Sequence, residues 1–211
     1  MMKRDWEVWD EKTVDFIEQT WGSPTKGNPI RHQRLIETVS THIEGGSVLD
    51  VGCGLGHLYP YLEPKIETYL GVDSSPVMIK RAQSHFGEHL FVVGDAYDLS
   101  PQPMMDTVVC CDVVKHVPET WPILEQLWSK ANKHVILVTN IGPIQRTKKT
   151  PKGDGKYLIY RFETTSNLMT LFHKLSNLET VKVIPFKGTK NTVIFKLNKK
   201  GKLFEDSMDD T

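Results

Sequence analysis

The chain is poor in cysteine, with Cys53, Cys110 and Cys111 as its only three, and none stands in a Cys-x-x-Cys pair. This count and spacing exclude a disulfide framework and a cysteine-based metal site, and they favour a reducing compartment. Cys110 and Cys111 are neighbours in a predicted strand, so their side chains face opposite sides of it. We interpret each as a small buried hydrophobic residue rather than a reactive thiol.

Net charge and long apolar runs are also missing. Lys plus Arg and Asp plus Glu both number 26, so the formal net charge is zero and no overall field attracts nucleic acid or an anionic membrane. No 18 apolar residues run together, and the N-terminus lacks the apolar region of a signal peptide. We therefore expect a cytoplasmic protein without a membrane or nucleic-acid partner. Nothing in the composition indicates an oligomeric state.

What the sequence does have is enough apolar material, 39% of 211 residues, for one α/β domain. Helical apolar spacing over 5–21 and 30–43 predicts an N-terminal helical cap, residues 1–46. The main domain is expected over 47–198. Within it, residues 141–162 are basic and rich in Pro and Gly, which predicts a loop or lid. The polar residues 199–211 are predicted to be a disordered tail.

Five short apolar runs, each followed by a polar or glycine corner and mostly by a helical pattern, predict a parallel doubly wound sheet. Two later runs alternate in polarity and predict an antiparallel hairpin that closes the sheet edge. The expected fold is thus α/β, doubly wound, with a mostly parallel seven-stranded sheet and a C-terminal antiparallel hairpin. The runs cover 47–51, 68–73, 90–93, 107–111 and 134–140, and the hairpin covers 181–184 and 193–197.

The first run leads into glycines at alternate positions, Gly52, Gly54 and Gly56, directly after Asp50. Glycines here let the backbone turn sharply and let a ligand approach without a Cβ in the way. A helix is expected to follow, and its unpaired N–H groups would point back at the turn and suit an anionic group. A Gly-x-Gly-x-Gly string alone also occurs as a bare tight turn, so its context decides.

That context is supplied by acids at the ends of the first three strands, Asp50, Asp73 and Asp95. Each alone has an ordinary explanation as a turn or cap residue. The carboxyl ends of parallel strands share one edge of the sheet, so the three acids are expected to lie together. They suit an extended ligand: Asp50 for an ammonium, Asp73 for ribose hydroxyls, and Asp95 with the Ala96 N–H for an amino-purine.

Over residues 47–140 the sequence resembles the class I S-adenosylmethionine-dependent methyltransferases. The matching segments are Val48-Leu49-Asp50-Val51-Gly52-Cys53-Gly54-Leu55-Gly56, Leu70-Gly71-Val72-Asp73, Val93-Gly94-Asp95-Ala96 and Met105 through Val117. The resemblance implies S-adenosylmethionine as cofactor and S-adenosylhomocysteine as product. It implies that Gly52, Cys53 and Gly54 flank the methionine part and that Asp73 holds the ribose. It further implies that Ser74 and Met78 border the adenine and that the Cys111 carbonyl meets the methionine amine.

Among the histidines, His116 is the candidate general base. It follows the fourth strand, where related proteins present residues to the pocket, and an ordinary histidine pKa suits neutral pH. The alternative is that His116 packs or caps at the start of a helix beginning at Pro118. His57 is interpreted as a helix-start residue. Arg31 and His32 begin the second predicted helix and could face a ligand, or they are solvated charges there.

The reaction expected from the resemblance is methyl transfer to an oxygen or nitrogen of a small-molecule acceptor. The chain has neither the Asn/Asp-Pro-Pro-Tyr/Phe pattern nor a Pro-Cys nucleophile, which argues against planar amines of DNA or glutamine and against cytosine ring carbon. No metal is predicted: Asp112 and Asn140 are present, but Thr139 replaces the second acid of a metal-dependent site.

Three other functions stay open. The basic residues 141–162, interleaved with Tyr157, Tyr160 and Phe162, would suit an RNA-directed methyltransferase, or a protein-directed one, in place of a small-molecule enzyme. A catalytically silent methyltransferase-like binding subunit is a second alternative. A nicotinamide dehydrogenase shares the strand–glycine–helix corner, but its fingerprint needs glycine where His57 stands.

Overall fold

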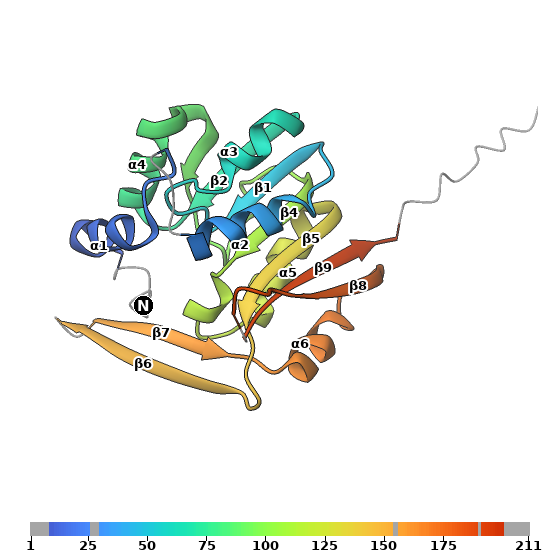
Figure 1. Ribbon diagram of the computed structural model, residues 1–211. Coiled ribbons are helices and arrows are strands. Elements are labelled where there is room, and N and C mark those ends of the chain that lie inside the picture. The colour runs from blue at the N-terminus through green and yellow to red at the C-terminus, as the bar shows by residue number, and fades with distance from the viewer. Residues whose placement is uncertain (1–8, 26–29, 154–155, 190, 201–211) are drawn as a thin grey trace, which may run out of the picture.

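A computed structural model describes residues 9–25, 30–153, 156–189 and 191–200. In this part of the chain a seven-stranded sheet has the order β3-β2-β1-β4-β5-β9-β8 (Figure 1). The first five of its strands in sequence run parallel, and β9 runs antiparallel to both β5 and β8. The strands are β1 (Ser47–Val51), β2 (Thr68–Asp73), β3 (Phe91–Val93), β4 (Met105–Cys111), β5 (Ala131–Asn140), β8 (Leu178–Pro185) and β9 (Thr192–Lys199).

Helices cover both faces of this sheet (Figure 1). Helices α2, α3 and α4 pack on one face, and α5 and α6 pack on the other. The sequence-based prediction of a doubly wound, mostly parallel sheet with a C-terminal antiparallel hairpin is confirmed. The helices are α1 (Glu11–Trp21), α2 (Ile30–Ser40), α3 (Tyr59–Leu62), α4 (Pro76–Phe86), α5 (Trp121–Lys130) and α6 (Thr165–Phe172), with short 3-10 turns η2 (Glu63–Lys65), η3 (Glu88–Leu90) and η4 (Val114–His116).

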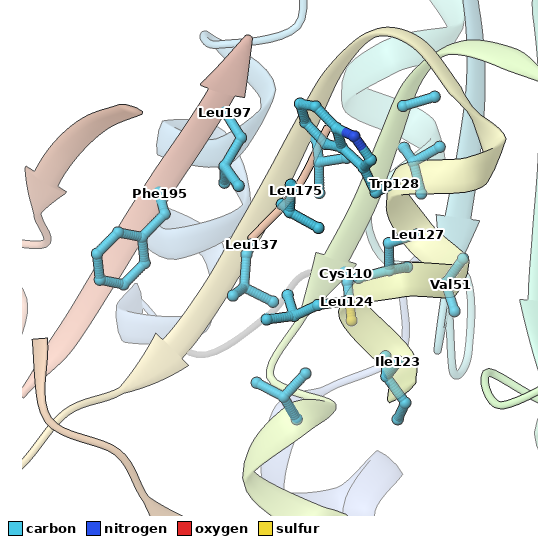
Figure 2. Close-up of a cluster of buried hydrophobic side chains, with 14 of the residues drawn as sticks. Val51, Cys110, Ile123, Leu124, Leu127, Trp128, Leu137, Leu175, Phe195 and Leu197 are labelled. Atoms are coloured by element: carbon cyan, nitrogen blue, oxygen red, sulfur yellow. The ribbon is translucent and has the colours of Figure 1, made fainter. Parts of the chain in front are cut away.

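Side chains of the central strands divide between two apolar clusters by strand alternation. On β1, Leu49 and Val51 face α5, whereas Val48 faces α2. Figure 2 shows the α5 face, where Leu124 of α5 projects toward Leu137 of β5. Because both faces of the sheet are buried in this way, the strands read as nearly continuous apolar runs in the sequence.

Local signals set the helix ends close to where the sequence places them. Asp10 caps α1 by accepting a hydrogen bond from the Thr13 N–H at 3.0 Å. Ser75 does the same for α4 with the Met78 N–H at 3.3 Å. The helix predicted from Pro118 starts later, because α5 begins at Trp121. The predicted residues 5–8 of the first helix lie outside the described residues.

The basic segment 141–162 is not a loop, as the sequence predicted, but an antiparallel pair, β6 (Arg146–Gly153) and β7 (Lys156–Phe162). This hairpin forms a sheet of its own, apart from the main sheet (Figure 1). Its base is fixed by buried Glu163, whose carboxylate accepts hydrogen bonds from Thr120 Oγ1 at 2.9 Å and Asn167 Nδ2 at 2.6 Å. The hairpin is therefore anchored to both α5 and α6.

At the C-terminus, the predicted tail begins one residue too early, because Lys199 ends β9. Residues 201–211 lie outside the described part of the chain. Across the described ranges, every helix is too short or too polar to cross a lipid bilayer.

Candidate active site

The glycine corner follows β1 directly and is held against β2. The N–H groups of Gly52 and Cys53 both donate to the Val72 carbonyl, at 2.7 and 3.1 Å. Gly52 has φ 76°, in the left-handed region that favours glycine. A Cβ added to Gly52 would lie 2.1 Å from Val113 Cγ2. Two strands and the segment after β4 therefore converge so tightly here that only glycine fits.

The helix behind the corner differs from the prediction. Residues 54–58 form turns, and α3 has only the residues Tyr59–Leu62. A four-residue helix has a weak dipole, because the macrodipole is a sum over aligned peptide units. The corner thus offers close backbone approach to a ligand, rather than the strong helix-start anion site that the sequence suggested.

Asp73 ends β2 and faces the corner. Its Oδ2 accepts the Gly54 N–H at 2.9 Å, and its Oδ1 accepts the Ser75 N–H at 2.9 Å. Burial raises the pKa of Asp73, and the hydrogen bonds from the Ser75, Gly54 and Ser74 backbone oppose that rise. Because a carboxylate has about four acceptor sites, Asp73 can still accept a hydrogen bond from a ligand hydroxyl.

One cavity of about 830 Å³ opens at this carboxyl edge of the sheet. It is lined by every residue that the sequence predicted for the site, and several unpredicted residues add aromatic and polar surface. The predicted residues are Asp50, Gly52, Cys53, Gly54, Asp73, Ser74, Met78, Asp95, Ala96, Cys111 and His116. The additional ones include Trp9, Trp21, His57 and Asp112, together with His32, for which the sequence left open that it faces a ligand. The parallel strands thus bring the predicted set together, while the individual roles stay predictions.

The remaining predicted cofactor residues are fixed by their own local contacts. Asp95 Oδ1 accepts the Tyr97 N–H at 3.0 Å, which turns the chain after β3 toward the cavity. Met78 is buried, and its Sδ would lie 3.9 Å from a Cβ on Gly54. Burial raises the pKa of the Cys53 and Cys111 thiols, so both stay neutral at pH 7.

Asp50 is buried, with 3% of its surface exposed. Its Oδ2 accepts a hydrogen bond from Tyr69 Oη at 2.8 Å. Burial raises the pKa of Asp50 to about 7, and the Tyr69 hydrogen bond opposes this rise without cancelling it. The carboxyl group is therefore divided between its neutral and ionised forms near neutral pH.

This raised pKa has a consequence for stability. Between about pH 4 and pH 7 the folded state holds a proton on Asp50 that the unfolded state has released, because the unfolded pKa is near 3.8. The free energy of unfolding should thus fall as pH rises through this window, by the contribution of this group. Urea unfolding at pH 4.5, 6 and 7.5 should show a smaller fall for Asp50→Asn than for the wild type. Equal slopes for the two proteins would contradict the assignment.

His116 lies in η4, after β4. Its Nδ1 is 2.8 Å from the Ile159 carbonyl of β7. A carbonyl only accepts, so Nδ1 carries the proton and Nε2 keeps its lone pair. The ring also meets Trp9 and Tyr160 edge-on, with centroids 5.7 and 5.1 Å away. The sequence suggested an ordinary histidine pKa here, but burial and then Lys115 lower the pKa of His116 to about 4, so the imidazole is neutral at pH 7. His116 both packs and lines the cavity, and its chemical role stays a prediction.

Two further histidines at the cavity depend on the N-terminal cap. His57 Nε2 lies 2.9 Å from the Gly22 carbonyl. The His32 ring stacks on Trp21 at 5.2 Å between centroids and meets the His57 ring edge-on at 4.8 Å. The sequence suggested that His32 could face a ligand, and the structure places it at the cavity. The Arg31 side chain lies outside the described part of the structure.

Helix α1 is held across one side of the cavity by ion pairs to α4. The Arg81 guanidinium contacts the carboxylates of Glu11 at 3.0 Å, Asp15 at 2.5 Å and Glu18 at 2.7 Å. Ser75 Oγ also donates to the Trp9 carbonyl at 2.9 Å. These contacts keep Trp9, Ile17 and Trp21 at the cavity wall. No single motif predicts this, because the partners are more than 60 residues apart.

Known proteins resemble this chain in sequence and in fold. Residues 48–134 match a family model described as "Methyltransferase domain". The "Ubiquinone biosynthesis O-methyltransferase" of Leptothrix cholodnii is 30% identical over 105 residues, which cover 46% of this chain and 44% of that protein. The Paraburkholderia xenovorans protein of that name is 24% identical over 196 residues, covering 82% and 83%. The chain thus spans less than half the length of the first of these relatives.

Among solved structures, magnesium protoporphyrin IX methyltransferase from Synechocystis PCC 6803 with bound SAH superposes with a TM-score of 0.68. The identity is 19%, and the alignment covers 93% of this chain and 98% of that one. At this identity the likeness concerns the fold alone. Because it covers 93% of this chain, it extends beyond the matched residues 48–134.

Proposed function

Because the chain belongs to the class I S-adenosylmethionine-dependent methyltransferase family, we propose that it transfers a methyl group from S-adenosylmethionine to an oxygen or nitrogen of a small molecule. One observation carries the proposal. The glycine corner, the doubly hydrogen-bonded Asp73 carboxylate and the predicted residues after β3 and β4 line a single cavity of about 830 Å³. A volume of this order accommodates a cofactor-sized ligand.

The residues at the corner fit this cofactor chemically. Gly52 and Gly54 line the cavity with backbone alone, which suits close approach of the amino acid end, and Asp50 offers a carboxyl group to its ammonium. The Asp73 carboxylate lies beside the corner and is an acceptor suited to ribose hydroxyls. Asp95 and Ala96 follow β3 at the purine end, with Ser74 and Met78 beside them. When bound, the cofactor supplies a methyl group on a sulfonium whose leaving group needs little assistance.

The chain's own contribution to the reaction is therefore placement and proton transfer. The apolar and aromatic side chains that line the cavity are proposed to position the acceptor. His116 is proposed to take the acceptor's proton at Nε2, because the Ile159 carbonyl fixes the proton of the free ring on Nδ1. Burial and then Lys115 lower the pKa of His116, and the same carbonyl and Asp112 oppose that lowering, so these two groups favour the imidazolium that forms.

Calorimetric titration tests the proposal. S-adenosylmethionine, S-adenosylhomocysteine, NADH and ATP are titrated separately into the full chain. We expect micromolar dissociation constants for the first two and no comparable heat for the others. Absence of heat with both S-adenosyl compounds would contradict the proposal, and selective NADH binding would favour a dehydrogenase.

The Arg81 contacts give a further prediction. Arg81→Met removes the charge that joins α1 to α4 while keeping a long apolar side chain. Individual surface ion pairs contribute about 0–1 kcal/mol, so loss of this group of three should weaken S-adenosylhomocysteine binding about threefold to tenfold. Stopped-flow displacement should show faster dissociation. Lys80→Met on the same helix is the control, and equal dissociation rates in the two variants would exclude a role for α1 in ligand retention.

A further inference from the structure

Two buried polar atoms at the cavity lack a hydrogen-bond partner among the described residues, His32 Nε2 and Asp112 Oδ1. Both residues line the cavity. A buried polar atom without a partner costs about 1–3 kcal/mol, so such atoms are rare unless a ligand or water completes them. The neighbouring corner residues, in contrast, have their own backbone partners. The two atoms therefore mark polar positions in the cavity that the described residues do not satisfy.

Asp112 is held in position from several sides. Its φ is 65°, a left-handed conformation unusual for a residue other than glycine. Its N–H donates to the Val138 carbonyl at 2.9 Å, which ties the turn to β5. Its Oδ2 meets Lys115 Nζ at 2.9 Å, and the Lys115 side chain is only 12% exposed. Lys115 thus pairs with one carboxylate oxygen, Oδ2. The other oxygen, Oδ1, has no hydrogen-bond donor among the described residues.

His32, unlike Asp112, is held in position by contacts with aromatic rings. It stacks on Trp21 and meets His57 edge-on, and His57 is fixed through the Gly22 carbonyl. Burial and then the nearby His57 lower the pKa of His32 to about 4, so the ring is neutral at pH 7. Asp112 raises this pKa and Lys115 lowers it, so the ion pair lies within electrostatic range of His32.

We propose that His32 Nε2 and Asp112 Oδ1 bind the polar group of the methyl acceptor, and that this acceptor is a mainly apolar molecule bearing a hydroxyl or amino group. This inference rests on the proposed methyltransferase function and specifies its substrate class. A carboxylate oxygen can only accept hydrogen bonds, so Asp112 requires a donor from the acceptor. A carboxylate-bearing acceptor would place like charges together, because Lys115 is already paired.

The walls around these atoms support the same class. Ile17, Trp21 and Ile36 line the cavity together with His32. Apolar and aromatic walls favour an apolar body, and a few placed polar atoms select its functional group. A site that hydrogen-bonds a hydroxyl discriminates strongly against an analogue without one, because its own polar atoms then stay unpaired.

The test uses simple probes on the full chain saturated with S-adenosylhomocysteine. Phenol, aniline, benzoate and toluene are titrated and followed by ligand-observed NMR. In the wild type, phenol and aniline should bind more tightly than both toluene and benzoate. His32→Phe keeps the ring stack but removes Nε2, and should reduce the preference for phenol over toluene about tenfold. His89→Phe, on an exposed histidine in η3, is the control.

The variant Asp112→Asn gives a second test, in which the affinity for benzoate should rise. Asparagine tolerates the left-handed backbone, so the fold should survive. The variant removes the repulsive charge and frees Lys115, so benzoate should gain affinity relative to phenol by about tenfold. Equal binding of phenol and toluene to the wild type, or an unchanged ranking in both variants, would overturn the inference. If S-adenosylhomocysteine itself fails to bind, the proposed function fails instead, and calorimetry in advance separates the two outcomes.

Discussion

Asp73→Ala is expected to weaken S-adenosylhomocysteine binding at least 100-fold. The substitution removes a charged acceptor of two ribose hydroxyls, and hydrogen bonds to charged groups contribute about 1.5–3 kcal/mol each. It also leaves the Gly54 and Ser75 N–H groups without the partners that now hold the corner. Isothermal titration calorimetry of the wild type and variant measures the effect directly.

A conservative variant separates these two contributions. Asp73→Asn keeps the shape and one carbonyl oxygen, so it should lie between the wild type and Asp73→Ala in affinity. Glu88→Gln, at an exposed acid in η3, should bind as the wild type does. If Asp73→Ala retained affinity within about threefold of the wild type, Asp73 would have no part in binding.

Gly52→Ala should destabilise the fold by about 3 kcal/mol. A side chain at φ 76° costs about 1–2 kcal/mol, and a Cβ placed 2.1 Å from Val113 Cγ2 adds overpacking strain of similar size. Valine is branched at Cβ and cannot rotate away freely. Urea unfolding gives the loss in stability, and calorimetry should show that S-adenosylhomocysteine binding is impaired as well.

The double variant Gly52→Ala with Val113→Ala tests the cause. Removing the Val113 methyl groups should restore the part of stability lost to the clash, but not the part due to the backbone conformation. Gly142→Ala is the matched control, because a Cβ there would meet its nearest atom at 3.4 Å and φ is not positive. Equal losses at Gly142 and Gly52 would show that close packing at the corner is unimportant.

The central sheet and the cavity at its edge were predictable from sequence because the strands are buried on both faces. Leu70 through Asp73 shows this: an apolar run gives the strand, and the acid that follows it must lie at the edge where parallel strands end. The predicted cofactor residues therefore meet at one cavity. The apolar runs, the acids that follow them and the rule that parallel strands end at one edge were together enough to predict this site.

The parts that prediction missed depend on packing between distant segments. Residues 146–153 contain Arg, Lys, Thr, Pro and Gly without apolar alternation, since most of the described side chains of β6 are exposed. Propensity favours a loop for such a sequence. His32 likewise gains its place from Trp21 and His57, which belong to different elements. No short sequence pattern predicts these contacts, because the residues that make them are far apart in the chain.

The hydrogen bond between His116 and the Ile159 carbonyl joins a residue inside the matched segment 48–134 to a hairpin outside it. The Ile159 carbonyl fixes the proton of the free ring on Nδ1 and opposes the fall in the pKa of His116 that burial and Lys115 cause. Exchange of residues 141–162 between related proteins should therefore shift the pH profile of methyl transfer while the residues of the glycine corner stay the same. Acid–base strength would then vary independently of the cofactor site.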